Sequence, residues 1–364
     1  MEYIDLATAG LSPGKFLGLQ RIADTGGTFT MLALDQNEAI VRMERSALAQ
    51  LSEDRDPTYE EFVVAKGNLT RILAPHSSAC LLDAPYGAWH TVATGRFPKG
   101  VGLLVCLERT TVTTDDGIGR ITLLEDDWSV AKIKGMGADA VKLLVHFEPT
   151  HKESVRLQRA LVRKVERECR KHDILFLLET LSYPLQGEES SSESYLKRKP
   201  TSVIRTARAL SKYCDVYKAE FPGTLGFDVE AKLTRNLEKL NNACRKPWVL
   251  LSAGTDFPDY RRQVEMALRH GANGILGGRS FWQEYFSAGT DVERCRWLST
   301  VAIRRLQEIS TLVHDEATPW FERYGWALSD FTAIEVPEKW YEGYGKKARR
   351  GASSHSAEQS DNAD

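Results

Sequence analysis

The sequence predicts an α/β fold, a (β/α)8 TIM barrel with an N-terminal helix and a C-terminal aromatic extension. Eight nearly continuous apolar segments alternate with helical patterns, as expected for parallel strands that are buried on both faces. Eight such units within roughly 250 residues fit a closed barrel better than an open, doubly wound sheet. The first strand is not followed by G-x-G-x-x-G, the signature of the open dinucleotide-binding fold.

The first half of the chain opens with a helical pattern over 13–22, which ends at a Gly-Gly pair. Apolar runs predict strands at 29–35, 79–83 and 101–108. Helical periodicity predicts helices over 38–51, 59–73 and 127–136. The acidic, threonine-rich segment 109–119 is expected to be a loop.

The second half continues the alternation. Apolar runs predict strands at 140–147, 174–180, 216–221, 248–254 and 274–279. Helices are expected over 153–172, 201–213, 229–241 and 259–270, and then through 290–315. The segment 182–200 is rich in serine and glutamate, so we expect a mobile loop there.

These boundaries divide the chain into an N-terminal segment (1–28), a barrel domain (29–318), an appendage (319–345) and a tail (346–364). The appendage is rich in tryptophan, tyrosine and phenylalanine, which fits either packing on the barrel or the interface of a homo-oligomer. The tail is basic, then polar and acidic, a composition typical of disorder.

Composition excludes several classes of function. A formal charge of −2 gives no reason to expect nucleic acid or an anionic membrane as a partner, and no apolar run is long enough to span a bilayer. The N-terminus lacks the pattern of a signal peptide, and the six cysteines are far apart without a CxxC pair, as in a cytoplasmic protein. The eight histidines are scattered, so neither a metal site nor another cofactor is expected.

Chemistry in such a barrel lies at the carboxyl ends of the strands. Two lysines, two carboxylates, an arginine and a few small polar or flexible residues fall there. They are Asp35, Gln36, Lys142, Glu179, Lys218, Ser252, Gly254, Gly278 and Arg279. Their convergence on one cavity would mark the active site, which we expect to bind a small molecule.

Each of these residues also has a purely structural interpretation. Lys218 could be a solvated lysine on an edge strand, and Asp35 could cap the helix that follows it. Lys142 and Glu179 could belong to structural ion pairs. The serine at 252 and the glycine at 254 could form only a tight turn.

The combination indicates Schiff-base chemistry. A buried lysine beside a second cation has a lowered pKa, so Lys218 could attack a ketone with Lys142 as that cation. The protonated imine is an electron sink that allows a neighbouring C–C bond to break. Glu179 would move protons, and desolvation would hold its pKa near the working pH. A phosphate would bind the backbone N–H groups after strands seven and eight, with Arg279.

Seven segments together resemble the class I tagatose 1,6-bisphosphate aldolase family, to which sulfofructose-phosphate aldolases are related. They are MLALDQ (31–36), LLDAPYG (81–87), GADAVKLL (137–144), FLLET (176–180), DVYKAEFP (215–222), WVLLSAGTD (248–256) and GILGGRSFW (274–282), and the similarity extends over 29–320. The resemblance implies a TIM barrel that cleaves a ketohexose bisphosphate to dihydroxyacetone phosphate and glyceraldehyde 3-phosphate without a metal.

The resemblance also assigns roles to the residues at matching positions. It implies that Lys218 forms the Schiff base, that Glu179 is the acid/base, and that Lys142 is the neighbouring cation. Asp35 and Gln36 would contact substrate hydroxyls. Phosphate ligands would be Ser252, Arg279 and the N–H groups of Gly254 and Gly278.

Three departures leave alternatives open. The Ser/Glu insertion (188–194) and the aromatic appendage match nothing in the family pattern, and 215–227 carries no extra basic residue after the lysine. A second anionic group would therefore need a cation from elsewhere. The alternatives are an aldolase for 6-deoxy-6-sulfofructose 1-phosphate or another keto-sugar phosphate, and a non-catalytic sugar-phosphate sensor. The sensor is disfavoured because it needs no imine chemistry.

Overall fold

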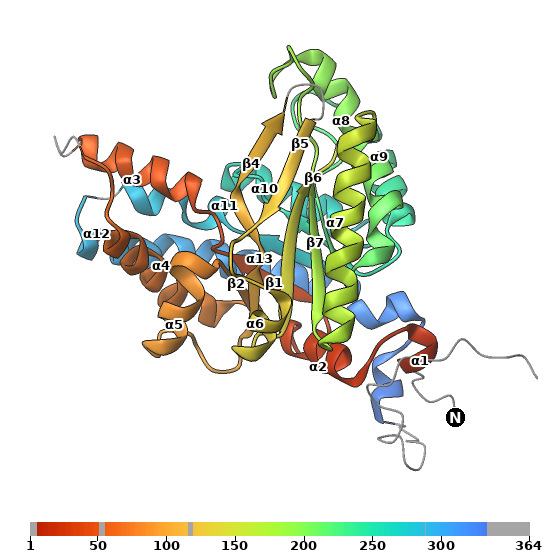
Figure 1. Cartoon of the computed structure of the whole chain (residues 1–364), viewed down its shortest axis with the longest axis horizontal. Helices are drawn as coiled ribbons and strands as arrows, with labels where there is room; N and C mark the ends of the chain where they lie inside the picture. The colour runs from red at the N-terminus through yellow and green to blue at the C-terminus, as the bar shows by residue number, and fades with distance from the viewer. Residues whose placement is uncertain (1–5, 51–54, 116–118, 288, 333–364) are drawn as a thin grey trace, which may run out of the picture.

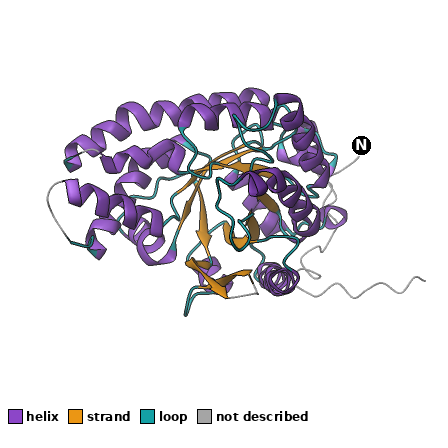
Figure 2. Cartoon of the chain, turned by 90° about the horizontal axis from the view of Figure 1, so that it is seen from above, coloured by secondary structure: helices purple, strands orange, loops and turns teal. Residues whose placement is uncertain are grey.

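The computed structural model describes residues 6–50, 55–115, 119–287 and 289–332 of the chain. Eight parallel strands close into a barrel in the order β1-β10-β9-β8-β7-β6-β3-β2, which confirms the predicted (β/α)8 TIM barrel. The strands are β1 (Phe29–Ala33), β2 (Ala79–Leu82), β3 (Gly102–Cys106), β6 (Ala140–His146), β7 (Leu175–Leu181), β8 (Val216–Ala219), β9 (Trp248–Leu251) and β10 (Gly274–Gly277). Figure 2 shows the strands enclosed by helices.

The helices occupy nearly all of the ranges that periodicity predicts. The helices of ten or more residues are α2 (Pro13–Ile22), α3 (Glu38–Gln50), α4 (Tyr59–Leu73), α7 (Lys152–Lys171), α8 (Glu193–Leu210), α9 (Glu230–Ala243), α10 (Phe257–Leu268) and α13 (Ile303–Glu316). Shorter helices are α1 (Leu6–Ala9), α5 (Trp89–Ala93), α6 (Val130–Gly135), α11 (Arg279–Trp282) and α12 (Asp291–Trp297). The start of α4 is fixed by a capping box between Thr58 and Glu61.

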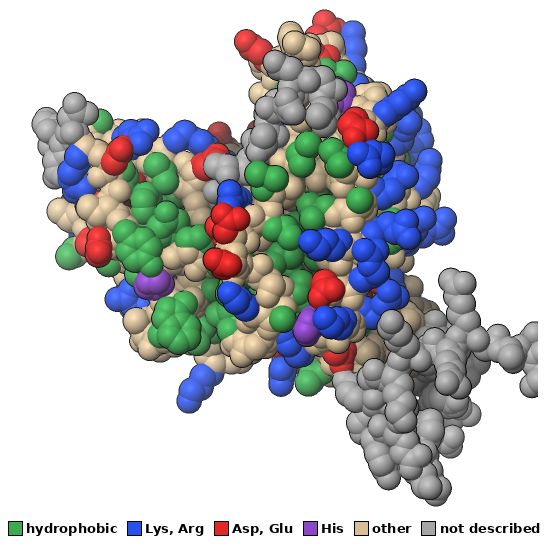
Figure 3. Space-filling model, viewed as in Figure 1, with side chains coloured by type: hydrophobic (Ala, Val, Ile, Leu, Met, Phe, Trp, Pro, Cys, Tyr) green, Lys and Arg blue, Asp and Glu red, His purple; other side chains and the backbone are tan. Residues whose placement is uncertain are grey.

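The longest helix, α7, shows how the ring of helices is attached. Its inner face buries Val162, Val165 and Cys169 against the strands. Its outer face is rich in arginine and lysine, and basic side chains gather at the edge of the molecule where α7 runs (Figures 1 and 3). The apolar stripe and the solvated basic face together explain the position of α7, and no binding role of its basic side chains is needed.

The inside of the barrel changes from apolar to charged along the strands. Side chains in a strand alternate between its two faces. Met31, Leu104, Ala140, Leu177 and Val216 therefore point inward and belong to one apolar cluster. The same inward alternation continues two or four residues later at charged side chains, which are Asp35, Glu108, Lys142, Glu179 and Lys218. The active-site layer is thus the next layer of the barrel core.

The amino end of the barrel is closed by α2 and the C-terminal segment. Leu19 and Ile22 of α2 are fully buried in the interior cluster, together with Trp320 and Phe321. The ring of Phe16 lies 5.8 Å from that of Trp320. The described part of the predicted appendage therefore packs on the barrel, whereas 333–345 and the predicted tail 346–364 lie outside the described residues.

Two predicted loops were wrong. Segment 109–119 contains nearly all of β4 (Glu108–Asp115) and the first residue of β5 (Gly119–Leu124). These two strands form an antiparallel hairpin that stands above the barrel beside β6 (Figure 1). The β-branched run at 110–114 favours a strand, and this propensity outweighs the acidic composition. The second predicted loop, segment 182–200, is helical in its second half. Helix α8 begins at Glu193 and includes Pro200 in its interior.

No helix among the described residues is long and apolar enough to cross a membrane. This agrees with the absence of a long apolar run in the sequence.

A buried ion pair fastens α2 to the barrel. The Lys15 ammonium lies 2.8 Å from Asp215, whose carboxylate also accepts a hydrogen bond from the backbone N–H of Phe176. Lys15→Met should lower the free energy of unfolding by about 3 kcal/mol because it leaves a buried carboxylate without its cation. Arg21→Met, on the same helix, removes an exposed pair with Asp139 and should cost less than about 1 kcal/mol. Urea denaturation measures both, and equal losses would contradict this account.

Candidate active site

Lys218 is a buried lysine inside the barrel, not a solvated edge lysine. It lies in β8 with 2% of its surface exposed. Its ammonium nitrogen is 3.0 Å from Oε2 of Glu179 in the adjacent strand β7. The pairing of β7 with β8 sets Glu179 directly beside Lys218, so the register of the sheet makes this contact.

Lys142 forms the centre of a cluster of charges. Its ammonium nitrogen lies 2.7 Å from Asp35, 2.5 Å from Glu108 and 3.0 Å from Glu179. The same Oε2 atom of Glu179 is therefore 3.0 Å from both lysine nitrogens. The structure brings the two predicted lysines and the two predicted carboxylates into one contact network.

Glu108 is a member of this network that the sequence analysis missed. It is 7% exposed and begins β4, directly after β3. Glu108 is the last residue of the predicted third strand, 101–108, and no function was predicted for its side chain. Alternation offered the signal, because Leu104, Cys106 and Glu108 are separated by two residues each and share the inward face.

The balance of charge sets the protonation states. Burial alone would raise the pKa values of Asp35 and Glu179, but Lys142 and Lys218 outweigh burial and lower both pKa values. Burial would lower the pKa of Lys142, but Asp35, Glu108 and Glu179 hold that pKa well above its usual value. The expectation that desolvation keeps the pKa of Glu179 near the working pH is therefore wrong.

Glu108 behaves differently from its neighbours. Burial raises its pKa above the usual glutamate value, and the negative charge of Asp35 adds to that effect. The ammonium of Lys142 only partly offsets them. One carboxylate of the cluster thus holds a proton more readily than the other two.

A second buried ion pair supports the loop after β1. Lys66 of α4 and Asp83, both fully buried, form an ion pair, and the Lys66 ammonium also donates to the side chain of Asn37. Gln36 donates to Asp35 at 3.0 Å. This loop therefore approaches the charged cluster from a fixed position.

The predicted phosphate ligands meet at the ends of β9 and β10. The N–H of Gly278 donates to Oγ of Ser252 at 3.2 Å. The N–H of Thr255 donates to the carbonyl of Ser252, and both intervening residues, Ala253 and Gly254, have positive φ. The segment is a tight turn, and a Cβ atom on Gly254 would lie 3.0 Å from the guanidinium carbon of Arg279.

Gly278 has a different steric requirement. A Cβ atom there would lie 2.5 Å from the carbonyl oxygen of Ala33 in the neighbouring strand. The glycine allows the chain to turn into α11 at the barrel rim, where Arg279 begins that helix.

A narrow cleft connects these two groups of residues. It is lined by Glu179, Lys218, Gln36, Ser252, Gly278 and Arg279, with apolar side chains between them. An amine and a carboxylate at the bottom of the cleft, with an arginine and backbone N–H groups at its rim, suit a small carbonyl compound that carries an anionic group. No group of three or more histidine, cysteine or acidic residues suited to a metal ion occurs in the described part of the chain.

Comparison with known proteins gives the family. The model of the DeoC/LacD family aldolases matches residues 29–284. The chain belongs to the DeoC/LacD aldolase family. It is 30% identical to tagatose 1,6-diphosphate aldolase of Listeria monocytogenes serotype 4a, over 90% of this chain and 99% of that protein. It is 32% identical to tagatose 1,6-diphosphate aldolase 2 of Streptococcus agalactiae serotype III, over 84% of this chain and 97% of that protein. The resemblance seen in the sequence is confirmed.

Solved structures share the fold of this DeoC/LacD aldolase. An archaeal fructose 1,6-bisphosphate aldolase superposes with a TM-score of 0.53 at 17% identity, over 83% of this chain and 99% of that one. The fructose-bisphosphate aldolase of Plasmodium falciparum superposes with a TM-score of 0.61 at 9% identity, over 87% of this chain and 98% of that one.

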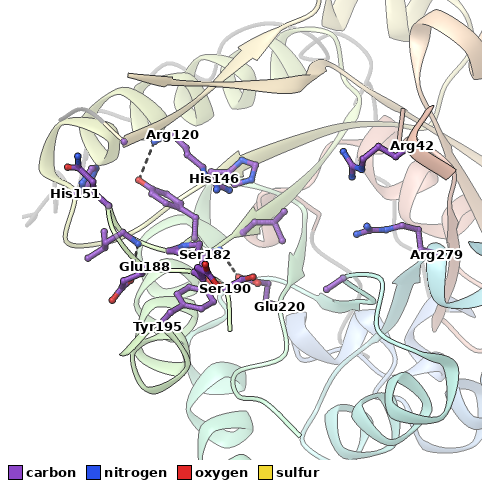
Figure 4. A pocket seen from close by; sticks show the side chains of 18 residues that line it. Arg42, Arg120, His146, His151, Ser182, Glu188, Ser190, Tyr195, Glu220 and Arg279 are labelled. Atoms are coloured by element: carbon purple, nitrogen blue, oxygen red, sulfur yellow. Dashed lines mark hydrogen bonds between the residues drawn. The ribbon is translucent and has the colours of Figure 1, made fainter. Parts of the chain in front are cut away.

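A larger cavity of about 1060 Å³ opens above the cleft of the aldolase. Leu181, Ala253 and Arg279 line both spaces, so the cleft is continuous with the cavity. Figure 4 shows Arg42 and Arg279 at one side of the cavity and Arg120 and His146 at the other.

The opposite pKa shifts in the aldolase predict opposite effects of two neutral substitutions. Glu108→Gln should leave the free energy of unfolding at pH 7 unchanged or higher, because a group with a raised folded pKa destabilises the fold once ionised. This advantage should disappear below about pH 4.3, where the unfolded carboxyl is protonated too. Asp35→Asn should lower stability at pH 7, because a lowered pKa stabilises the fold above the unfolded value.

Urea denaturation between about pH 2 and pH 8 measures both effects. The loss in Asp35→Asn should shrink as the pH falls toward the folded pKa of Asp35. A Glu108→Gln protein that is destabilised at pH 7 as strongly as Asp35→Asn would contradict the assignment.

Proposed function

We propose that the protein is a class I aldolase that cleaves a ketohexose bisphosphate, foremost tagatose 1,6-bisphosphate, to dihydroxyacetone phosphate and glyceraldehyde 3-phosphate. The observation that carries the proposal is the buried amine of Lys218, 3.0 Å from Glu179 at the bottom of an open cleft. The names of the Listeria and Streptococcus relatives support the substrate. The same names support a place in carbohydrate metabolism, and the six free cysteines support a reducing compartment such as the cytoplasm.

The first step is formation of the imine. Glu179, ionised at neutral pH because its pKa is lowered, accepts a proton from the Lys218 ammonium across 3.0 Å. The neutral amine attacks the ketone carbon C2, and the C=O electron pair goes to oxygen, which takes up the proton that the attacking nitrogen loses. The protonated carboxyl of Glu179 then gives its proton to the carbinolamine hydroxyl, which leaves as water. The product is a protonated imine on Lys218.

The second step breaks the C3–C4 bond. A base removes the proton from the C4 hydroxyl, C4 becomes the aldehyde of glyceraldehyde 3-phosphate, and the bonding electrons move through C3 and C2 to the imine nitrogen. We assign proton removal to Glu179, which is ionised again after water leaves. Protonation of the enamine at C3 and hydrolysis of the imine release dihydroxyacetone phosphate and restore the amine.

Lys142 supplies a permanent positive charge beside Glu179. Its three carboxylate contacts keep it protonated at neutral pH, so it remains a fixed cation beside Glu179 through the cycle. We assign contacts with substrate hydroxyls to Gln36, which lines the cleft, and to Asp35, which accepts a hydrogen bond from Gln36. The 1-phosphate would bind Arg279, Ser252 and the N–H groups of Gly254 and Gly278.

Reductive trapping tests the Schiff base. Incubation with dihydroxyacetone phosphate and borohydride should attach a reduced adduct to Lys218, unaffected by chelator, as located by peptide mass spectrometry. Lys218→Met should lose adduct formation and at least about 1000-fold of the cleavage rate while keeping the wild-type melting temperature. Lys212→Met, which removes an exposed lysine that lies over the ring of Tyr213, is the control and should retain both. Activity that survives in Lys218→Met would end the proposal.

The phosphate turn can be tested by a pair of glycine substitutions. Gly254→Ala should raise KM for the bisphosphate roughly 10-fold, because the new Cβ atom, 3.0 Å from the Arg279 guanidinium carbon, displaces it from the phosphate. Gly226 has the same backbone requirement, with φ of +79°, but a Cβ atom there meets nothing within 4 Å. Gly226→Ala should therefore cost about 1 kcal/mol of stability and leave KM unchanged. If both variants change KM alike, the steric argument fails.

A further inference from the structure

The cavity above the cleft has arginine or histidine side chains on two opposite walls. Arg42 and Arg279 extend from one wall, and Arg120 and His146 from the other, with open space between them (Figure 4). Arg279 also lines the narrow cleft that contains Lys218, whereas Arg120 lines only the outer cavity. The Arg279 wall is therefore near the reactive amine, and the Arg120 wall is remote from it.

The backbone of Arg120 is fixed from three directions near the turn of the β4–β5 hairpin, where Arg120 pairs with Thr114. Its N–H donates to the hydroxyl of Tyr183 at 3.4 Å, and its carbonyl accepts from the side chains of Ser154 and Gln158 of α7. The guanidinium lies over the ring of Tyr183, 5.3 Å from its centre. An inserted hairpin thus presents one arginine at a defined place in the wall.

Among the residues whose side chains the structure describes, which exclude 110–118, no carboxylate forms an ion pair with the Arg120 guanidinium. Three glutamates also line the cavity. Glu188 pairs with Arg198 and Glu220 with Lys199, whereas Glu189 accepts a hydrogen bond from Ser191. A half-buried guanidinium without a carboxylate, facing a cavity, has the properties of an anion ligand.

His146 adds a hydrogen-bond donor beside Arg120 without adding charge. It ends β6 on the same strand face as Lys142, and its Nδ1 atom is buried without a hydrogen-bond partner in the described part of the chain. Burial first, and then the charge of Arg120, lower the pKa of His146 to about 4, so its ring is neutral at pH 7. A neutral imidazole carries one N–H that can donate to an oxyanion.

We propose that Arg120 and His146 form a second anion site, which binds the phosphate on the aldehyde half of the substrate. This inference rests on the proposed function, which supplies a ketose with an anionic group at each end. The ketone end binds at Arg279 beside Lys218, and the 6-phosphate lies across the cavity against the hairpin. This site supplies the cation that is missing after the lysine strand, and it selects bisphosphates over monophosphates.

The purely structural alternative is that Arg120 only packs on Tyr183. The reverse reaction separates the two interpretations, because aldol condensation uses two half-substrates with one phosphate each. Arg120→Met should raise KM for glyceraldehyde 3-phosphate roughly 10- to 100-fold, the usual effect of losing a charge-assisted hydrogen bond. With unphosphorylated glyceraldehyde as the acceptor, the same variant should match the wild-type rate within about twofold.

Two further variants serve as controls. Arg163 of α7 lies over the ring of Tyr213 at 6.0 Å on the outside of the barrel, so Arg163→Met removes a similar contact away from the cavity and should change neither rate. Arg120→Lys keeps a charge and should recover part of the KM for glyceraldehyde 3-phosphate. It also replaces Arg120→Met as the test if that variant does not fold.

The possible results are distinct. Equal losses with both acceptors would show a structural role for Arg120, and an unchanged KM for glyceraldehyde 3-phosphate would show no role; either overturns the second anion site. Borohydride trapping of dihydroxyacetone phosphate does not involve the far phosphate, so Arg120→Met should retain it. Loss of trapping in the wild-type protein would instead refute the proposed function and this inference with it.

Discussion

The arrangement of the active-site layer depends on one carboxylate oxygen that two buried lysines share. Oε2 of Glu179 lies 3.0 Å from the nitrogens of both Lys142 and Lys218. A buried ammonium is costly unless it is paired, and two of them at one place need more negative charge than Glu179 supplies. Asp35 and Glu108 provide it through direct contacts with Lys142. Among the described residues, Lys142 thus has three carboxylate contacts and Lys218 has one, with Glu179.

The barrel places this layer by extending its own core. The alternation that packs Met31, Leu177 and Val216 against one another below carries Asp35, Glu179 and Lys218 into the same interior above. The register between β6 and β7 and between β7 and β8 then decides which charged groups become neighbours. Closure of the opposite end by α2 and the aromatic C-terminal segment keeps the lower layers dry and rigid. The amino end of the barrel thus contributes stability, and the carboxyl end carries the charged residues of the active site.

Much of this was predictable from the sequence, and the failures have physical causes. The barrel, its eight strands and the convergence of Lys142, Lys218, Glu179 and Asp35 follow from apolar runs and strand ends. Glu108 was missed because strand ends were judged by position and not by inward alternation. The pKa of Glu179 was misjudged because burial is visible in a sequence, whereas the distances to two lysines are not. The hairpin and the start of α8 were missed because polar composition was taken to mean loop, although threonine favours strands and Pro200 lies within a helix.

The β4–β5 hairpin is hydrogen-bonded within itself and forms a sheet separate from the eight described strands of the barrel. Beyond Glu108, which contacts Lys142, an insertion of this kind can lengthen, shorten or change sequence in evolution without shifting the register of any strand that positions Lys218 or Glu179. Variation there is free of the constraint that couples every barrel strand to its neighbours. Within such a lineage, the catalytic step can be inherited unchanged while substrate range diversifies, and an engineer could exchange the part of the hairpin beyond Glu108 as a module.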